Sequence, residues 1–318
     1  MAAIFPGQGC QFIGMLSDLF DKNLIIQKIF KKASDILKYD LWKLIQKGPL
    51  KKLNTTYYSQ PAILIASFAI YKLWIQKSNI IPNIMVGHSL GEYTAMLCSN
   101  VINFYDAIQL INYRGKLMQE ISVSLKESNI DGYFMQVILG LNKFLIQKVC
   151  EQESKNNIVN ISSYNTYNQV TISGNKNAIL RVINACKLLG AHNIPLQINV
   201  PSHCLLMKPI VKKFKKFLKN IKFNYPTIPI INTLNIKCET SPKKIKYNLI
   251  HQLYNPINWI GCMEYISNKN INNILEFGPK NILAKIAKNI TNNLDVISIN
   301  NSKTLSIALK KYNNLRIK

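Results

Sequence analysis

Ser89 lies in a segment, Gly87-His88-Ser89-Leu90-Gly91, whose spacing suits a nucleophile held on a sharp turn. Residues 80–86 before it are apolar and largely β-branched and predict a buried strand, whereas residues 90–99 predict a helix. The two glycines remove side chains that would clash in a tight turn, so the serine hydroxyl can project into a cleft. The N–H of Leu90, at the helix start, could stabilise an oxyanion. The segment therefore predicts a serine nucleophile.

His203 is the histidine best placed to activate that serine. It follows a predicted strand over 194–200 and stands at the start of a helix, so it shares with Ser89 the carboxyl edge of a sheet. His88 is adjacent to the serine and would point away from it. A neutral imidazole could accept the serine proton and return it to a leaving thiol; a histidine that only caps its own helix is the alternative. No acidic residue stands out as a third member, so a backbone or amide carbonyl would orient the imidazole.

Arg114 lies at the centre of an apolar helix face. Its neighbours at spacings of three, four and seven are all apolar: Ala107, Leu110, Ile111, Leu117, Met118 and Ile121. A guanidinium in such surroundings is costly unless an anion meets it, and it can hold a carboxylate through two parallel hydrogen bonds. An internal salt bridge is the alternative, but the chain has only 15 Asp and Glu residues. We therefore expect Arg114 to bind a carboxylate of a ligand.

The order of the predicted elements indicates an α/β fold with an insertion. Strand, helix, strand, strand, helix and strand are predicted in turn over 132–140, 141–153, 157–164, 169–173, 175–189 and 192–200. This β-α-β-β-α-β order is typical of a ferredoxin-like module, so we expect a small subdomain over 123–194. Residues 1–122 and 195–318 would form the large α/β domain. It would open with a strand over 2–5 and close with a strand near 274–277, a Gly278-Pro279 turn and a helix.

The composition indicates a folded protein of the cytoplasm. With 318 residues, 48% of them hydrophobic, the chain can bury a large core. Its seven cysteines are scattered without a C-x-x-C pair, so we expect reduced thiols and no metal site. The longest apolar run, residues 62–71, is too short to cross a bilayer, and no basic leader opens the chain.

The formal charge of +25 has two interpretations. A nucleic acid or another acidic partner would explain it. However, the charge is mostly lysine, is spread along the chain and accompanies abundant Asn and Ile, as translation of an AT-rich genome would give. We favour this compositional interpretation. On the helix predicted over 205–219, lysines surround an apolar stripe and form either a solvated face or a dock for an acidic partner: Lys208, Lys212, Lys213, Lys215, Lys216 and Lys219.

Five motifs follow one another along the chain: Phe5-Pro6-Gly7-Gln8-Gly9, Gly87-His88-Ser89-Leu90-Gly91-Glu92-Tyr93, Arg114-Gly115-Lys116, Val200-Pro201-Ser202-His203 and Gln252-Leu253-Tyr254-Asn255-Pro256. In this order the chain resembles the bacterial malonyl-CoA:acyl-carrier-protein transacylases of type II fatty acid synthesis. The resemblance extends over essentially the whole chain. Any one motif would be weak, whereas five in order are specific.

The resemblance implies an enzyme that uses Ser89 as its nucleophile and His203 as the base. Backbone N–H groups of Gln8 and Leu90 would hold the oxyanion, and Gln252 would supply the carbonyl that orients the imidazole. The implied reaction is ping-pong acyl transfer through a malonyl-serine ester. It needs no metal and no redox cofactor.

The resemblance also implies the substrates and the architecture. Arg114 would pair with the malonyl carboxylate, and Asn165 would be a further binding position in the small subdomain. The acyl donor is the CoA thioester malonyl-CoA, and the acceptor is the phosphopantetheine thiol of acyl carrier protein. Neither nucleic acid nor a membrane is implied, and we expect a monomer. The family fold is an α/β-hydrolase-like large domain with a ferredoxin-like insert.

Two positions depart from the family pattern. Cys10 stands where serine is usual, and Lys280 replaces the customary glycine after Gly278-Pro279. A position that needed a positive φ would strain a lysine, so the second departure puts the geometry of this turn in doubt.

Two other classes of function remain open. A serine hydrolase could use the same serine and histidine with water as acceptor, but it would have no need for a buried Arg114. A noncatalytic nucleic-acid-binding protein would explain the charge but leaves the ordered motifs unexplained.

Overall fold

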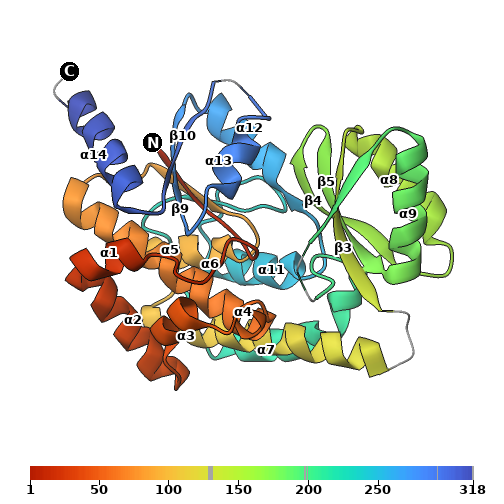
Figure 1. The fold of residues 1–318 in the computed structure, drawn as a ribbon, viewed down its shortest axis with the longest axis horizontal. Helices are drawn as coiled ribbons and strands as arrows, with labels where there is room; N and C mark the ends of the chain where they lie inside the picture. The colour runs from red at the N-terminus through yellow and green to blue at the C-terminus, as the bar shows by residue number, and fades with distance from the viewer. Residues whose placement is uncertain (128–131, 197, 199, 292, 317–318) are drawn as a thin grey trace.

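The chain folds around two five-stranded sheets that lie in separate lobes (Figure 1). The computed structural model describes residues 1–127, 132–196, 198, 200–291 and 293–316. The strands are β1 (Ala2–Phe5), β2 (Ile84–Gly87), β3 (Tyr133–Leu139), β4 (Val159–Thr166), β5 (Gln169–Asn175), β6 (His192–Pro195), β7 (Ile230–Ile231), β8 (Ile257–Asn258), β9 (Asn273–Phe277) and β10 (Asp295–Ile299). The first sheet has the order β10-β9-β1-β2-β7 and the second β6-β3-β5-β4-β8.

Helices cover both sheets. They are α1 (Ser17–Lys22), α2 (Leu24–Leu37), α3 (Leu41–Lys47), α4 (Leu50–Leu53), α5 (Thr56–Ser78), α6 (Gly91–Cys98), α7 (Phe104–Glu127), α8 (Lys143–Ser154), α9 (Lys176–Leu188), the 3-10 helix η1 (Leu205–Ile210), α10 (Val211–Lys219), α11 (Pro242–Gln252), α12 (Trp259–Asn268), α13 (Ile282–Ala287) and α14 (Ser302–Arg316). No helix in the described part of the chain is both long and apolar enough to span a bilayer.

Strand β1 lies at the centre of the first sheet, and all of its neighbours in that sheet run parallel to it. Its side chains alternate between the two faces, as the pleat of a strand requires. Ala3 and Phe5 pack into the core that includes α5 and α7, whereas Ala2 and Ile4 pack with α12 and α13. Because both faces are covered, the strand is apolar throughout. Phe5 is in register with Gly87 of β2, so the loops that follow the two strands emerge side by side.

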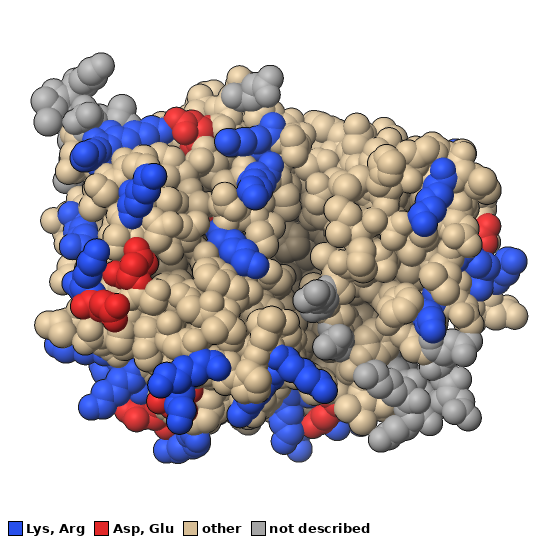
Figure 2. All heavy atoms as spheres, viewed as in Figure 1, with Lys and Arg blue, Asp and Glu red and all other residues tan. Residues whose placement is uncertain are grey.

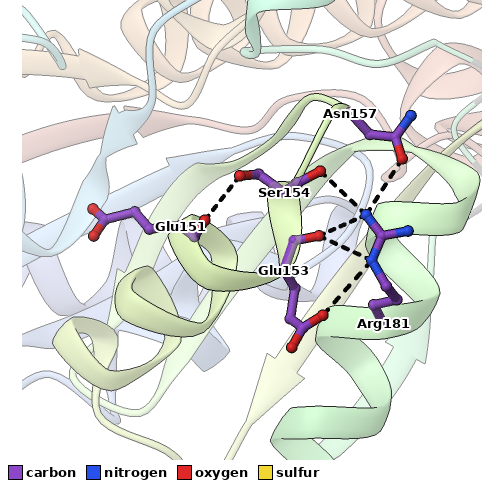
Figure 3. A network of polar contacts seen from close by, with 5 residues as sticks. All are labelled: Glu151, Glu153, Ser154, Asn157 and Arg181. Atoms are coloured by element: carbon purple, nitrogen blue, oxygen red, sulfur yellow. Dashed lines mark hydrogen bonds and ion pairs between the residues drawn. The ribbon is translucent and has the colours of Figure 1, made fainter.

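The second sheet carries α8 and α9 on one face, at the right of Figure 1. Arg181 of α9 ties the two helices together (Figure 3). Its guanidinium donates to the backbone carbonyls of Glu153 at 2.7 Å and Ser154 at 3.1 Å, at the end of α8, where carbonyls lack helical partners. It also lies 3.6 Å from the Glu153 carboxylate. Helices α8 and α9 are therefore held together by apolar packing and by Arg181, which caps the carboxyl end of α8.

The β-α-β-β-α-β order predicted over 132–200 is confirmed as β3-α8-β4-β5-α9-β6. Strand β6 ends at Pro195, and residues 197 and 199 of the longer predicted strand lie outside the described residues. One partner of this sheet was missed. Strand β8 comes from the carboxyl-terminal part of the chain and pairs parallel with β4, through Ser163↔Ile257 and Tyr164↔Asn258.

Two other predictions were wrong in part. The large unit does not close with the helix after Gly278-Pro279, because β10 then adds an edge strand beside β9 and α14 follows it. The helix predicted over 205–219 is also not α-helical throughout. Its first six residues form η1, which contains Pro209, and only Val211–Lys219 form an α-helix. A proline lacks the N–H that an α-helical interior needs.

Candidate active site

Ser89 lies in the turn between β2 and α6, next to the end of β1. The backbone is packed so closely there that positions 87 and 91 have no room for a side chain. A Cβ added to Gly87 would lie 1.8 Å from the Gly91 carbonyl carbon, and one added to Gly91 would lie 2.0 Å from the Phe5 carbonyl oxygen. Ser89 itself has a φ of +53°, a conformation that few non-glycine residues adopt. The turn thus holds the serine in a strained position, and Ser89 lines a cavity that lies between the two sheets.

His203 contacts this serine directly. Its Nε2 lies 2.6 Å from Ser89 Oγ, and its Nδ1 lies 2.7 Å from the backbone carbonyl oxygen of Gln252. The carbonyl can only accept, so Nδ1 carries a proton and Nε2 is left free to accept the serine proton. Burial, reinforced by the positive charge of Arg114, lowers the pKa of His203 to about 3. The imidazole is therefore neutral at pH 7, the state that a general base requires.

Two backbone N–H groups border the same turn. Gln8 and Leu90 both line the cavity, and within the described part of the chain neither backbone N–H donates to a protein acceptor. The side chain of Gln8 is held by Thr56, to which its amide donates at 3.1 Å. Free N–H groups beside a nucleophile are available to a developing oxyanion.

Arg114 is 2% exposed and lies on α7 among the apolar neighbours that its spacing predicted. It stacks over the ring of Tyr93, 5.3 Å from the centroid, and its Nη1 donates to Gln60 Oε1 at 2.8 Å. In the described structure its Nε and Nη2 have no hydrogen-bond acceptor, and no carboxylate forms an ion pair with it. Burial lowers its pKa, which the neighbouring Tyr93 and Glu92 oppose. Arg114 therefore offers two unused donors to an anion.

The cavity that joins these groups has a volume of about 600 Å³ and lies between the two lobes. The face of the molecule that is drawn in Figure 2 has a hollow near its middle. Among the described residues, the lining of this cavity contains two cationic side chains, Arg114 and Lys280, and no carboxylate. An anionic molecule thus meets no like charge on entering. Lysines and arginines elsewhere on this face are scattered, without forming one continuous patch.

Asn165 of β4 also lines the cavity, but its side chain is committed to neighbours in the second sheet. Its Oδ1 accepts from Ser163 Oγ at 2.6 Å, and its Nδ2 donates to Thr171 Oγ1 at 3.1 Å. His88 turns away from the nucleophile toward this cluster, with Nε2 3.1 Å from Ser163 Oγ. Burial lowers the pKa of His88 to about 4. Through this contact of His88 with β4, the turn that holds Ser89 is linked to the second sheet.

Sequence reasoning missed two buried residues that touch the site. Gln60 is fully buried and binds Arg114, and Glu92 is 3% exposed and binds the side chain of Gln252. Gln60 stands two residues before the apolar run over 62–71, and a single amide at such a position could have indicated a buried polar partner. Glu92 stands in the first turn of a helix, where an acidic residue is ordinary. It carried no local signal.

The two departures from the family motifs are accommodated. Cys10 Sγ lies 3.2 Å from the Gly7 carbonyl oxygen, so the thiol can donate where a serine hydroxyl would. Lys280 is not among the residues with positive φ, so the concern about its backbone was unfounded. Its Nζ lies 5.5 Å from the centre of the Phe12 ring, at the cavity. Among the described residues no cluster of His, Cys, Asp and Glu is placed to bind a metal ion.

The family model described as an acyl transferase domain matches residues 3–259 of the chain. The malonyl CoA-acyl carrier protein transacylase of Escherichia coli K12 is 41% identical over 310 residues, which are 97% of this chain and 98% of the relative. That of Buchnera aphidicola subsp. Schizaphis graminum is 43% identical over 311 residues, or 97% of this chain and 98% of the relative. The chain therefore belongs to the malonyl CoA-acyl carrier protein transacylase family.

Solved structures agree with this assignment. An acyl carrier protein S-malonyltransferase from Vibrio cholerae superposes with a TM-score of 0.91 at 40% identity, covering 96% of this chain and 99% of its own. A malonyl-transacylase solved in complex with a type II PKS acyl-carrier protein superposes with a TM-score of 0.93 at 41% identity. The match covers 98% of this chain and 99% of that one.

Proposed function

We propose that this protein transfers the malonyl group from malonyl-CoA to the phosphopantetheine thiol of acyl carrier protein, through a malonyl ester on Ser89. One observation carries the proposal. The Ser89–His203 pair, 2.6 Å apart, shares its cavity with a buried arginine that has two unused donors. The pair supplies a nucleophile and a base, and the arginine supplies the partner for a carboxylate.

In the first half-reaction His203 Nε2 takes the proton of Ser89 as Oγ attacks the thioester carbonyl. The carbonyl carbon becomes tetrahedral, and its oxyanion is held by the backbone N–H groups of Gln8 and Leu90. The C–S bond then breaks, and the imidazolium returns its proton to the sulfur, so that CoA leaves as its thiol. Arg114 holds the malonyl carboxylate throughout and thus fixes the position of the carbonyl carbon.

In the second half-reaction the carrier-protein thiol takes the place of CoA. His203 accepts the thiol proton while sulfur attacks the malonyl-serine ester, and the proton passes to Ser89 Oγ as the ester bond breaks. Malonyl-carrier protein and free enzyme result. The two half-reactions use the same groups in opposite order, as ping-pong transfer requires.

Intact-protein mass spectrometry tests this function. Mixing with malonyl-CoA should add one malonyl group to the protein, and adding phosphopantetheinylated carrier protein should move that group to the carrier. Release of free malonate at the same rate with and without carrier protein would instead indicate a serine hydrolase. Failure to form any adduct would contradict the proposed intermediate.

His203→Ala is expected to slow acylation by roughly a hundredfold to ten-thousandfold, the usual effect of losing a general base. The serine, the oxyanion donors and Arg114 would remain, so the KM for malonyl-CoA should change little. The measurement is the single-turnover rate of malonyl-serine formation at pH 7. His192→Ala is the matched control, because His192 begins strand β6, is exposed and does not line the cavity. A rate near that of the wild type would move the role of base elsewhere.

The lysines of α10 are candidates for docking the carrier protein through acidic side chains on its surface. Lys212, Lys213 and Lys216 are all exposed, and Lys213 lies 3.4 Å from Glu120 of α7. Lys213 and Lys216 also border a hollow of about 450 Å³ beside the stacked rings of Tyr113 and Phe217. Cationic side chains of this kind speed the encounter with an acidic partner.

Replacing these three lysines together by glutamate should raise the KM for carrier protein at least about tenfold and leave the KM for malonyl-CoA nearly unchanged. The control carries the same charge change on α2, at the exposed Lys28, Lys31 and Lys32. Steady-state kinetics with each substrate varied in turn separates the two effects. Equal KM values for carrier protein in the two triple variants would show that the α10 lysines form a solvated face and do not dock the carrier protein.

We also propose that the two lobes correspond to an α/β-hydrolase-like unit, residues 1–122 and 195–318, and a ferredoxin-like insert, residues 123–194. The all-parallel first sheet and the β6-β3-β5-β4 order of the second support this division. The enzyme would act in the cytoplasm as a monomer.

A further inference from the structure

Glu92 is a buried carboxylate three residues beyond the nucleophile, in the first turn of α6. In the described structure each hydrogen-bond partner of its two oxygens can donate. Oε1 accepts from Asn232 Nδ2 at 2.9 Å, and Oε2 accepts from Gln252 Nε2 at 2.6 Å and from Thr233 Oγ1 at 3.4 Å. Its partners come from the loop after β7 and from the end of α11, so the carboxylate ties three segments together. The reaction steps given above make no use of it.

Gln252 connects this carboxylate to both members of the catalytic pair. The residue is fully buried. Its backbone carbonyl accepts from His203 Nδ1 at 2.7 Å, and its side-chain Nε2 donates to the backbone carbonyl of Ser89 at 3.3 Å as well as to Glu92. One residue thus holds the imidazole through its main chain and the nucleophile turn through its side chain.

The carboxylate determines which way the Gln252 amide faces. Burial raises the pKa of Glu92 to about 7. In either protonation state the carboxyl oxygens that face the amide N–H groups of Asn232 and Gln252 accept hydrogen bonds, and the Ser89 carbonyl can only accept as well. With Nε2 toward them, both acceptors are satisfied. A flipped amide would place Oε1 against two other oxygens. In the described structure Oε1 has no hydrogen-bond partner of its own, so nothing on its side of the amide sets the orientation.

We propose that Glu92 is a positioning residue for acyl transfer: through Gln252 it fixes the distance and the angle between His203 and Ser89. It would thereby govern proton transfer and leave substrate binding unaffected. The proposal rests on the function proposed above. It differs from a general stabilising role, because the carbonyl that orients His203 belongs to the same residue that Glu92 holds.

Glu92→Gln removes one of the two acceptor positions and keeps the shape of the side chain. Its single oxygen cannot face both Asn232 and Gln252. Asn232 cannot turn to adapt, because its Oδ1 already accepts from the backbone N–H groups of Leu234 and Asn235, at 3.1 and 3.3 Å. The Gln252 amide should therefore lose its fixed orientation in part of the molecules.

The expected result is a fall of roughly tenfold to a hundredfold in the single-turnover rate of Ser89 malonylation, since small misplacements of reacting groups have effects of this size. The KM for malonyl-CoA should change by less than about threefold, because Glu92 does not line the cavity and forms no ion pair with Arg114 in the described structure. Loss of a residue with a purely structural role would not lower the malonylation rate while leaving the KM nearly unchanged.

Glu92→Gln combined with Asn232→Asp provides a rescue. The carboxylate introduced at position 232 would accept from the new amide at position 92 and would still accept from Leu234 and Asn235. The amide at position 92 could then turn its oxygen to Gln252. The double variant is expected to recover to within about threefold of the wild-type rate. The buried charge is retained but moved to a neighbouring side chain, so recovery would assign the effect to the hydrogen-bond pattern.

Ser99→Ala is the matched control for stability. Ser99 is fully buried at the other end of α6, donates to the Ile228 carbonyl at 2.6 Å and accepts from the Ile228 N–H at 2.8 Å. Its loss should lower the melting temperature and leave the malonylation rate within about twofold of the wild type.

The outcomes are distinct. A wild-type rate in Glu92→Gln, or a slow rate that Asn232→Asp fails to rescue, would overturn the positioning role. A loss of rate in Ser99→Ala as large as that in Glu92→Gln would overturn it too. Absence of malonyl-serine in the wild-type protein would contradict the proposed function instead, so the two failures can be told apart.

Discussion

Ser89→Ala is expected to abolish the malonyl adduct completely while the fold stays intact. The substitution removes only the attacking oxygen, and the strained turn is maintained by Gly87, Gly91 and the strands on either side. No other hydroxyl lies within hydrogen-bond distance of His203 Nε2 in the described structure. The measurement is intact-protein mass spectrometry after mixing with malonyl-CoA, together with the melting temperature of the variant.

Ser162→Ala is the matched control for that experiment. Ser162 lines the same cavity, but its hydroxyl donates to the Thr171 carbonyl at 3.1 Å, and in the described structure no histidine forms a hydrogen bond with it. This variant should acquire the malonyl group at nearly the wild-type rate. A malonyl group that persisted on Ser89→Ala would refute the assignment of the nucleophile.

The elements that carry the site were predictable because their signals are local. Residues 2–5 and 84–87 are continuous apolar runs that end in glycine-containing turns, and such runs indicate strands buried on both faces. Strand β8 has only two residues and shows no periodicity. Its place is set by pairing with β4, a contact between segments far apart in the sequence. Pattern analysis of a single sequence has no access to such contacts.

The chemistry of the site was predictable to a similar degree. Ser89 could be identified because glycines flank it in a predicted turn between a strand and a helix. Arg114 could be identified because it is a charged residue on an otherwise apolar helix face. The positive φ of His203, +60°, could not be predicted, because neither glycine nor asparagine marks the position. The contact between Glu92 and Gln252 was equally hidden, because 160 residues separate them. Residues that position a catalytic group need only be adjacent in space.

Arg114→Ala is expected to invert acyl selectivity without abolishing transfer. The serine, histidine and oxyanion donors would remain, whereas the partner of the malonyl carboxylate would be lost. Charged hydrogen bonds contribute about 1.5 to 3 kcal/mol each. Since about 1.4 kcal/mol corresponds to a factor of ten, two such bonds in a buried site separate malonyl from acetyl by several powers of ten in kcat/KM.

The apolar residues around Arg114 decide the direction of the change. Five apolar neighbours of Arg114 on α7 are buried: Ala107, Leu110, Ile111, Leu117 and Met118. Met118 also lines the cavity, so without the guanidinium this part of the site is neutral and tolerates an acetyl group better than a carboxylate. Transfer from acetyl-CoA and from malonyl-CoA to carrier protein should be compared in the wild type, in Arg114→Ala and in Arg181→Ala. Arg181 caps α8 outside the cavity, so its loss should leave the malonyl preference intact. An unchanged preference in Arg114→Ala would exclude this arginine as the carboxylate's partner.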